Sequence, residues 1–255
     1  MLRFKNAIVR RPGLSVVSGL RDGDGADPTY EGVLAEHDAY VAALRGAGVA
    51  VTVLEPLEAF PDAVFVEDPA LVFETGAILL RPGAASRAGE AVEIKPVLDA
   101  HFDRVLEQTE GHADGGDVLV TPDKVMIGLS ARTDADGAKN VISLLATLGR
   151  TGEIFHTPEG VLHFKSDCSL LDETTVLSTP ALAAGGAFAG MDVVLTPDGE
   201  EGAANALRVN DALFVGAQFP KTIALLTAGG YQVVPLPTAE IAKIDAGLSC
   251  MSLRW

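Results

Sequence analysis

The chain has 255 residues, 48% of them hydrophobic, so it is long enough to bury a substantial core without disulfides or a structural metal. Its 19 Lys plus Arg against 35 Asp plus Glu give a formal charge of −16. That charge argues against nucleic acid and anionic membranes and favours a cationic partner, although ordinary acidic proteins carry similar charge. No apolar run is long enough for a transmembrane helix or a signal peptide, so we expect a cytoplasmic protein without membrane contact.

The N-terminal part predicts a strand, a helix and a second strand. The first strand is expected at Asn6–Arg10, the helix at Tyr30–Leu44 and the second strand at Val49–Leu54. Between the first strand and the helix, Gly19–Asp27 is rich in Gly and Asp and predicts a long surface loop, a candidate lid.

The middle of the chain predicts one pattern four times: a hairpin, a helix and a strand. Apolar or β-branched residues flank a polar turn in the four predicted hairpins, which are Leu71–Leu80, Asp117–Gly128, Cys168–Leu177 and Ala206–Val215. Helical spacing follows each hairpin, at Arg87–Phe102, Asp134–Leu148, Pro180–Gly190 and Pro220–Gly229. A short strand then follows each helix, at Arg104–Glu107, Glu153–His156, Asp192–Thr196 and Tyr231–Pro235. The pattern returns at intervals of roughly 40–50 residues, a spacing typical of repeat architectures.

A fifth unit is predicted from the two ends of the chain. Ser249–Trp255 alternates like a strand and can supply the hairpin partner that the N-terminal strand lacks. Five such units around an axis would close a ring, and closure would explain why no linker divides residues 1–255, which we therefore treat as one domain. An ordinary open α/β sheet is the alternative, and periodicity alone does not separate the two.

Two cysteines are present, without a CxxC pair, so the sequence indicates neither a disulfide framework nor a zinc site. Cys250 follows Ala246-Gly-Leu-Ser249, where a glycine turn enters a strand and can hold a thiol at the mouth of a cavity. A free cysteine is more often a small buried hydrophobe, and we assign that structural role to Cys168.

Two further segments carry candidate acid–base groups. His163 lies in the apolar run Val161–Phe164, where a histidine is usually a core residue but can also transfer protons. Asp114 and Asp117 flank two glycines, which let the backbone bend sharply and present a carboxylate just before a strand. His112 stands nearby, but no second His or Cys lies at ligand spacing, so we expect no metal.

Three carboxylates interrupt the apolar, strand-like run Phe60–Pro69: Asp62, Glu67 and Asp68. Buried carboxylates are costly unless they are paired. A planar cation with forked donors, such as a guanidinium, is a natural partner. That cation would be either a substrate or an internal arginine.

Taken together, these segments resemble the dimethylarginine dimethylaminohydrolase family of the guanidino-modifying (pentein) superfamily, along essentially the whole chain. The matching motifs are Phe60–Pro69, Arg81–Glu90, Asp114–Asp117, Ile127–Thr133, Leu162–Ser166, Ala203–Asn205 and Lys243–Ser252. Departures from the family pattern concentrate in Gly19–Asp27 and at Asp167. The resemblance implies an α/β fold, the five-bladed ββαβ propeller with pseudo-fivefold symmetry.

The same resemblance implies roles for individual residues. It makes Cys250 the nucleophile, His163 the general acid/base and Asp114 the carboxylate that completes the triad. It also implies substrate-binding roles. Asp68, with Asp62 and Glu67, would bind the guanidinium, and Phe65 would pack on the alkyl chain. Arg87 and Arg132 would bind the α-carboxylate, and the backbones of Leu20 and Ile244 would contact the amino acid.

The implied activity is the hydrolysis of Nω-methylated L-arginines to L-citrulline and methylamines through a covalent thiouronium on the cysteine, without a cofactor. The partner would be a small cationic substrate, and the protein a monomer or homodimer. Arginine deiminase and amidinotransferase share the ring but are typically longer. A non-enzymatic ribosome-binding protein of the same fold is a further alternative, which the charge of −16 disfavours.

Overall fold

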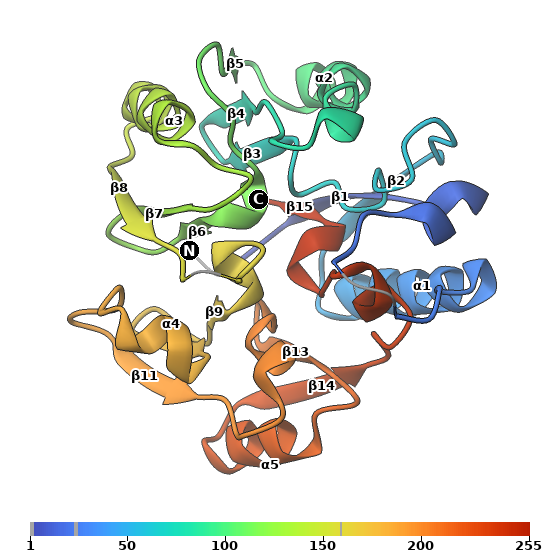
Figure 1. Cartoon of the computed structure of the whole chain (residues 1–255), viewed down its shortest axis with the longest axis vertical. Helices are drawn as coiled ribbons and strands as arrows, with labels where there is room; N and C mark the ends of the chain where they lie inside the picture. Colours follow the sequence, from blue (N-terminus) through green and yellow to red (C-terminus); the bar gives the residue numbers. More distant parts are fainter. Residues whose placement is uncertain (1–2, 23–24, 159) are drawn as a thin grey trace.

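The computed structural model describes residues 3–22, 25–158 and 160–255, so Gly23 and Asp24 of the predicted lid loop lie outside the described residues. These residues form five three-stranded sheets. Figure 1 shows the sheets arranged around a common centre, with the helices at the periphery. Each sheet and its helix make one ββαβ unit, and this arrangement is the predicted pentein ring.

The units have the following bounds. The first comprises β15 (Leu253–Arg254), β1 (Asn6–Arg10), α1 (Tyr30–Gly46) and β2 (Ala50–Leu54). The second comprises β3 (Ala70–Phe73), β4 (Gly76–Leu79), α2 (Glu90–His101) and β5 (Val105–Glu107). The third comprises β6 (Val118–Val120), β7 (Val125–Leu129), α3 (Ala135–Thr147) and β8 (Gly152–His156). The fourth comprises β9 (Cys168–Leu170), β10 (Thr175–Ser178), α4 (Pro180–Ala184) and β11 (Asp192–Leu195). The fifth comprises β12 (Leu207–Val209), β13 (Ala212–Gly216), α5 (Pro220–Ala228) and β14 (Gln232–Leu236).

One pairing rule holds in all five sheets. The first strand runs antiparallel to the middle strand, and the last strand runs parallel to it, as in β6–β7–β8. A parallel neighbour requires a crossover connection, which the helix supplies. Side-chain caps start several of these helices: Thr29, Asp134 and Thr179 each accept a hydrogen bond from the backbone amide three residues on.

The two ends of the chain close the ring within one sheet. β15 pairs antiparallel to β1, with Leu253 opposite Ile8 and Arg254 opposite Ala7. The C-terminal segment therefore supplies the missing strand, as its alternation predicted. Because this sheet joins residues from both termini, closure depends on long-range pairing that no local pattern specifies.

Several predicted elements differ from the observed ones. In the predicted strand Ser249–Trp255, Ser249–Met251 is a 3-10 helix and only Leu253–Arg254 is a strand. The helix predicted from Arg87 begins at Glu90, after a separate 3-10 turn. Helix α4 ends at Ala184 and not at Gly190, because Gly185 caps it and Gly186 adopts a left-handed φ of 73°. The run Phe60–Pro69 is a series of turns and not a strand, with backbone bonds such as Phe65 N–H to Asp62 C=O at 2.9 Å. Consecutive turns direct several carboxylates of one short segment toward the interior.

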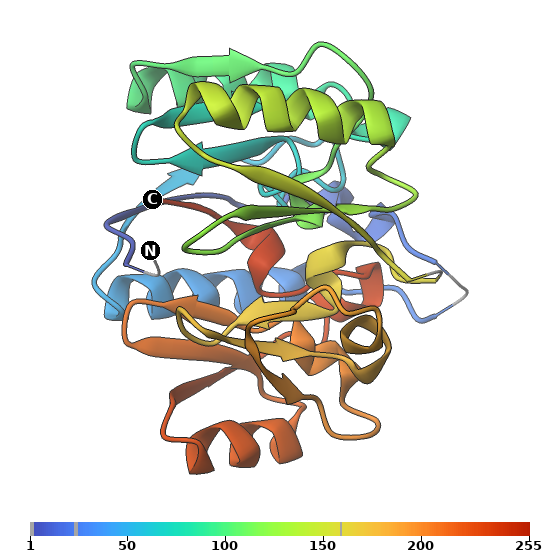
Figure 2. The same ribbon diagram turned by 90° about the vertical axis from the view of Figure 1, so that its left-hand side faces the viewer.

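The ring has two different faces, which Figure 2 shows from the edge. Both chain ends lie on one side, while the segments that flank residue 159 lie on the opposite side. The innermost strands β3, β6, β9, β12 and β15 surround a cavity of about 460 Å³ on the side of the chain ends, where Arg3 and Trp255 line it. Within the described part of the chain, no helix is long and apolar enough to span a membrane.

Candidate active site

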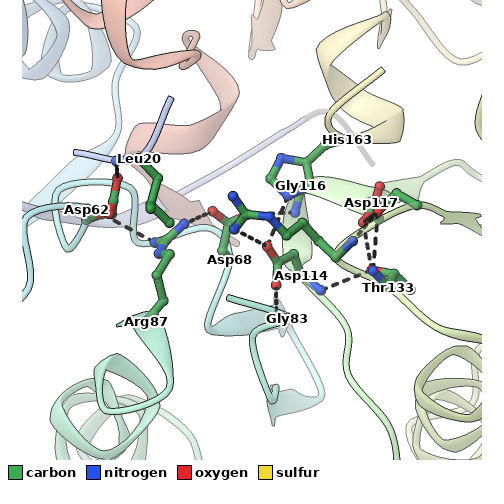
Figure 3. Close-up of polar contacts among 12 residues, drawn as sticks. Leu20, Asp62, Asp68, Gly83, Arg87, Asp114, Gly116, Asp117, Thr133 and His163 are labelled. Atoms are coloured by element: carbon green, nitrogen blue, oxygen red, sulfur yellow. Dashed lines mark hydrogen bonds and ion pairs between the residues drawn. The ribbon is translucent and has the colours of Figure 1, made fainter. Parts of the chain in front are cut away.

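The Asp114–Asp117 segment brings the histidine and its carboxylate together (Figure 3). Asp114 Oδ2 lies 3.0 Å from His163 Nε2, and Asp114 Oδ1 accepts from Gly83 N–H at 2.8 Å. Asp114 is fully buried and His163 is 7% exposed. One carboxylate oxygen thus holds the imidazole while the other is fixed by the backbone, an arrangement that orients the ring for proton transfer.

Close packing explains the two glycines between the aspartates. A Cβ at Gly115 would lie 2.0 Å from the Glu67 carbonyl oxygen, and a Cβ at Gly116 would lie 2.8 Å from the His163 ring. The Gly116 amide also donates to Asp68 Oδ1 at 3.0 Å. The glycines therefore allow this backbone to pass directly beside both Asp68 and His163.

Asp117 supports the same site through hydrogen bonds to neighbouring segments of the chain. Its carboxylate accepts from the Ser130 and Thr133 hydroxyls, both at 2.6 Å, and from Phe164 N–H at 2.8 Å. These contacts tie the segment before β6 to the turn after β7 and to the residue that follows His163. We interpret Asp117 as a positioning residue because the described contacts of its carboxylate are with protein groups on two neighbouring segments.

Asp68 belongs to a buried ionic network with Arg87 and Glu90. Arg87 pairs with Asp68 through Nη1, and its Nε and Nη2 contact the Glu90 carboxylate at 2.9 and 2.7 Å. Arg87 Nη2 also donates to the Phe65 carbonyl at 2.9 Å. The Arg87 guanidinium is thus held by protein acceptors, and an internal arginine partner for Asp68 is present, one of the two possibilities that the sequence left open.

Cys250 lies in the short 3-10 helix η7 (Ser249–Met251), just before β15. Its thiol is partly buried, whereas Cys168 is buried at 1% exposure, as its structural assignment requires. Asn205 Nδ2 lies 3.9 Å from the Cys250 Sγ, and Asn205 Oδ1 accepts from Ser249 N–H at 3.0 Å. Asn205 therefore holds the backbone beside Cys250 and offers a donor to its sulfur.

A narrow cavity of about 30 Å³ joins these groups. Its lining contains nine of the predicted residues, namely Leu20, Asp62, Phe65, Asp68, Arg87, Arg132, His163, Ile244 and Cys250, together with Leu162, Asp245 and Ala246. The larger axial cavity contains neither Cys250 nor His163 in its described lining, so we place the chemistry in the narrow one. Leu20 and Cys250, which are 230 positions apart in the sequence, thus line the same small cavity.

Two predicted residues lie beside this cavity and not in its described lining. Asp114 stands behind His163, where its partner role predicts it. Glu67 faces the axial cavity, where its carboxylate contacts Lys165 Nζ at 2.6 Å and the Ser249 hydroxyl at 3.1 Å. Its predicted contact with a guanidinium stays a prediction.

The remaining predicted binding residues line the same cavity. Leu20 donates its N–H to Asp62 Oδ1 at 2.9 Å, which joins the loop segment to the acidic wall. Asp22 N–H contacts Asp245 Oδ2 at 2.6 Å, next to Ile244. Arg132 Nη1 lies 3.8 Å from Asp114 Oδ2, and its side chain is 19% exposed. Arg132 is thus more accessible to a ligand than Arg87.

The environment sets the ionisation of the histidine and the thiol. Burial opposes a charged imidazole, but Asp68, Asp114 and Asp117 outweigh it and raise the pKa of His163 from 6.5 to about 9. Burial, together with Glu67 and Asp68, raises the pKa of the Cys250 thiol to about 11. At neutral pH the site therefore holds an imidazolium, suited to act as an acid, beside a neutral thiol.

Asp68, Asp114 and His163 also form a group whose ligand atoms lie within 4.8 Å of one another. Their environment does not suit a divalent ion. Asp68 already contacts Arg87 and the Gly116 amide, and the raised pKa of His163 means that a metal would have to displace a proton. These three residues fit proton transfer beside a bound cation better than metal ligation.

Asn205 is the functional candidate that sequence reasoning left without a role. Its motif, Ala203–Asn205, carried part of the family resemblance, but no local pattern connected it with residue 250. Gly247 gives the structural reason for the contact, because a Cβ there would lie 2.4 Å from Asn205 Cγ. Gly83 and Asp117 were likewise unassigned, since their partners lie on other segments.

Comparison with known proteins identifies the family. A family model described as N,N dimethylarginine dimethylhydrolase, eukaryotic, matches residues 22–149. A dimethylarginine dimethylaminohydrolase of Pseudomonas aeruginosa is 37% identical over 254 residues, covering 99% of this chain and 100% of that protein. The chain belongs to the dimethylarginine dimethylaminohydrolase family.

Other members of the dimethylarginine dimethylaminohydrolase family match over the same length. A Streptomyces coelicolor member is 32% identical, covering 98% of this chain and 96% of its own. A structure of the Pseudomonas aeruginosa enzyme, a Cys-to-Ser variant in complex with citrulline, has a TM-score of 0.96 at 36% identity. It covers 99% of this chain and 100% of that chain, which confirms the predicted family and its fold.

Proposed function

We propose that this protein hydrolyses Nω-methylated L-arginines to L-citrulline and a methylamine. The observation that carries the proposal is the meeting of the Cys250 thiol, the His163 imidazole and the Asp68 carboxylate around one cavity. Family membership supports the same reaction, because relatives are named for it and one was crystallised with citrulline. The expected cofactor requirement is none, since no redox step occurs.

The acidic wall provides the recognition of the substrate cation. Asp62 and Asp68 are 5% and 3% exposed, so a guanidinium between them exchanges water for fixed charges. Burial raises the pKa of Asp62, whereas Arg87 and His163 overcome burial and lower the pKa of Asp68. Asp68 is thus the stronger acid of the two and the main anionic partner that we assign to the substrate cation.

The two arginines have different proposed tasks. Arg132, partly exposed in the lining of the same cavity, is placed to bind the substrate α-carboxylate, for which a forked donor is suited. Arg87 would bind the same carboxylate only by giving up part of its contacts with Asp68 and Glu90. We therefore assign the main anchoring contribution to Arg132 and a combined ionic and binding role to Arg87.

Chemistry begins when the substrate cation lowers the pKa of the Cys250 thiol, which loses its proton to solvent. The thiolate attacks the guanidinium carbon, forming a C–S bond and a tetrahedral adduct. The imidazolium of His163 gives its proton to the departing methylamine as the C–N bond breaks, which leaves a thiouronium on Cys250.

The second half of the reaction returns the enzyme to its starting state. Neutral His163 removes a proton from a water molecule, which attacks the thiouronium carbon and forms the C–O bond of citrulline. The C–S bond then breaks with its electron pair going to sulfur, and the hydroxyl proton of the adduct passes to that sulfur as the carbonyl of citrulline forms. This step restores the neutral Cys250 thiol, and the proton held by His163 remains available for the next cycle. Asp114 stabilises the imidazolium in both halves through its 3.0 Å contact.

The deciding experiment measures citrulline release from asymmetric dimethylarginine and from arginine, at equal concentrations, with the purified protein. We expect turnover of the methylated substrate, and we expect Cys168→Ser, a matched control at the buried thiol, to keep it. Release from arginine alone would replace the proposal with an arginine deiminase. Absence of citrulline from both substrates would reject the proposed function.

A further inference from the structure

The cavity on the ring axis is a second, separate pocket. Its volume is about 460 Å³, a size common for small-molecule sites. Its described lining shares no residue with the narrow cavity around Cys250. The boundary runs between consecutive residues: Glu67 and Ser249 line the axial cavity, while Asp68 and Cys250 line the narrow one.

Direct contacts seal this boundary. The Glu67 carboxylate contacts Lys165 Nζ at 2.6 Å and accepts from the Ser249 hydroxyl at 3.1 Å, while Glu67 N–H donates to the Cys250 carbonyl at 3.2 Å. A ligand on one side therefore does not touch the reacting groups on the other. Figure 2 is consistent with this separation, because the chain ends, next to the axial cavity, lie on one face of the ring.

The axial cavity has the opposite charge from the rest of the molecule. Its described lining holds five cationic residues and two acidic ones, Glu67 and Glu74, within a chain of net charge −16. The cations are Arg3, Arg150, Lys165, Arg208 and Arg254. Arg208 donates to the carbonyl oxygens of Asn210 and Leu171 at 2.7 and 3.4 Å. Arg3 pairs with Asp211 at 2.7 Å and the same carboxylate interacts electrostatically with Arg208, but the lining still holds more cations than acids. A concave surface with an excess of one sign concentrates counter-ions.

Two polar groups of this lining are without a partner. The Ser169 hydroxyl and Arg254 Nε are buried and make no hydrogen bond in the described structure. Ser169 is only 7% exposed. Buried donors are normally satisfied, so these two atoms leave unused hydrogen-bonding capacity within the wall, behind its accessible surface.

The rest of the wall is apolar and partly aromatic. Its apolar side chains include Phe4, Phe73, Leu119, Leu170, Leu253 and Trp255. A fully hydrated inorganic ion would leave these surfaces without contact, whereas an apolar body would cover them. Charge and shape together specify the ligand class.

We propose that the axial cavity binds a small organic anion with an apolar body, a site distinct from the one that processes cationic arginines. The carboxylate or equivalent acidic group of the ligand lies toward Arg208 and Arg254, and its apolar part packs against Leu170 and Trp255. This proposal goes beyond the proposed function and does not depend on it.

Octanoate is the probe for the test, with 1-octanol and octylammonium as the uncharged and cationic comparisons. Trp255 is the only tryptophan among the 255 residues, so a change in tryptophan emission on titration reports on this cavity. Isothermal titration calorimetry gives the stoichiometry. We expect saturable one-to-one binding of octanoate, and binding of both comparison compounds at least about tenfold weaker.

Arg208→Gln provides the residue-level test, and Arg104→Gln is its matched control. Arg104 is also bonded to a carbonyl, that of Thr147 at 3.0 Å, but is exposed and outside the described lining. We expect octanoate affinity to fall roughly fivefold or more in Arg208→Gln and to stay unchanged in Arg104→Gln. If Arg208→Gln does not fold, the comparison of octanoate with 1-octanol in the wild type decides.

Equal affinity for octanoate and 1-octanol, or absence of saturable binding, would overturn the proposal. A folded Arg208→Gln protein with unchanged octanoate affinity would do the same. Saturating methylated arginine is expected to leave octanoate binding intact, and displacement would place both ligands in one site. Because binding is measured without turnover, failure of the hydrolase proposal leaves this test unaffected.

Discussion

Two cavities on the same ring have opposite chemical character. The narrow one has buried aspartates at 62 and 68 beside a thiol, and the axial one has an excess of arginine and lysine above apolar walls. Both arise from the same ββαβ repeat. The difference therefore comes from the irregular segments between strands, above all Phe60–Pro69 and Gly115–Asp117, which project to one face.

The two cavities are separated between the consecutive residues Glu67 and Asp68. They are neighbours in a run of turns, yet Glu67 contacts Lys165 on the axial side and Asp68 contacts Arg87 on the catalytic side. Turns change the side-chain direction at each residue, whereas a strand would alternate regularly. Two adjacent acids thus serve two environments, a division that variants on either side can test.

Cys250→Ser should give the largest effect. A serine hydroxyl is far less acidic and less nucleophilic than a thiol, so we expect citrulline release to fall at least about a thousandfold with the fold intact. Octanoate affinity at the axial cavity should stay at the wild-type value, since Cys250 lies outside its described lining. Near-normal turnover would remove Cys250 from the role of nucleophile.

Asp114→Asn should reduce kcat/KM by roughly a hundredfold near neutral pH. Asp114 raises the pKa of His163, so its loss lowers that pKa from about 9. Since the acid must be protonated to act, the alkaline limb of the pH–rate profile should move to lower pH. Asp123→Asn, on the exposed turn between β6 and β7, is the control. A lower rate with an unmoved alkaline limb would mean that Asp114 only stabilises the fold.

Repeating local patterns made the ring predictable. β1 was predicted with its observed bounds, and the four internal hairpins lie within two residues of theirs, because apolar alternation and turn residues are local signals. α4 was predicted too long because the pattern did not show where Gly185 and Gly186 would end it. Closure by β15 needed the additional inference that the two chain ends belong to one sheet.

The site was predictable through its motifs and not through its contacts. Cys250, His163 and Asp68 were each ambiguous alone, and only the family resemblance selected them. The contacts of Arg87 with Glu90, and of Asn205 with the segment before Cys250, depend on the three-dimensional path of distant segments. No residue pattern predicted the axial cavity, because each of the five inner strands contributes only a few residues to it.

Asn205→Asp should give an intermediate effect and sharpen the description of the thiol. The substitution keeps the shape of the side chain but replaces the Nδ2 donor, 3.9 Å from Sγ, with a carboxylate oxygen. We expect the pKa of Cys250 to rise and turnover to fall by about tenfold. The pH dependence of alkylation by iodoacetamide measures this pKa directly. Asn140→Asp, on α3, is the control, and an alkylation profile unchanged in Asn205→Asp would exclude a role for the amide.

Glu67→Gln should produce the smallest effects, but of opposite sign at the two cavities. Loss of its charge leaves Lys165 and Arg254 less neutralised, so octanoate affinity should rise by roughly threefold. The same loss weakens attraction for a cationic substrate, so its KM should rise by a similar factor. Glu74→Gln is the matched variant, because Glu74 also lines the axial cavity, whereas Glu67 in addition contacts Ser249 and Cys250 at the boundary with the narrow one. It should strengthen octanoate binding and leave KM alone. If both variants change KM equally, the charge acts across the whole ring, and the division at Glu67 is not electrostatic.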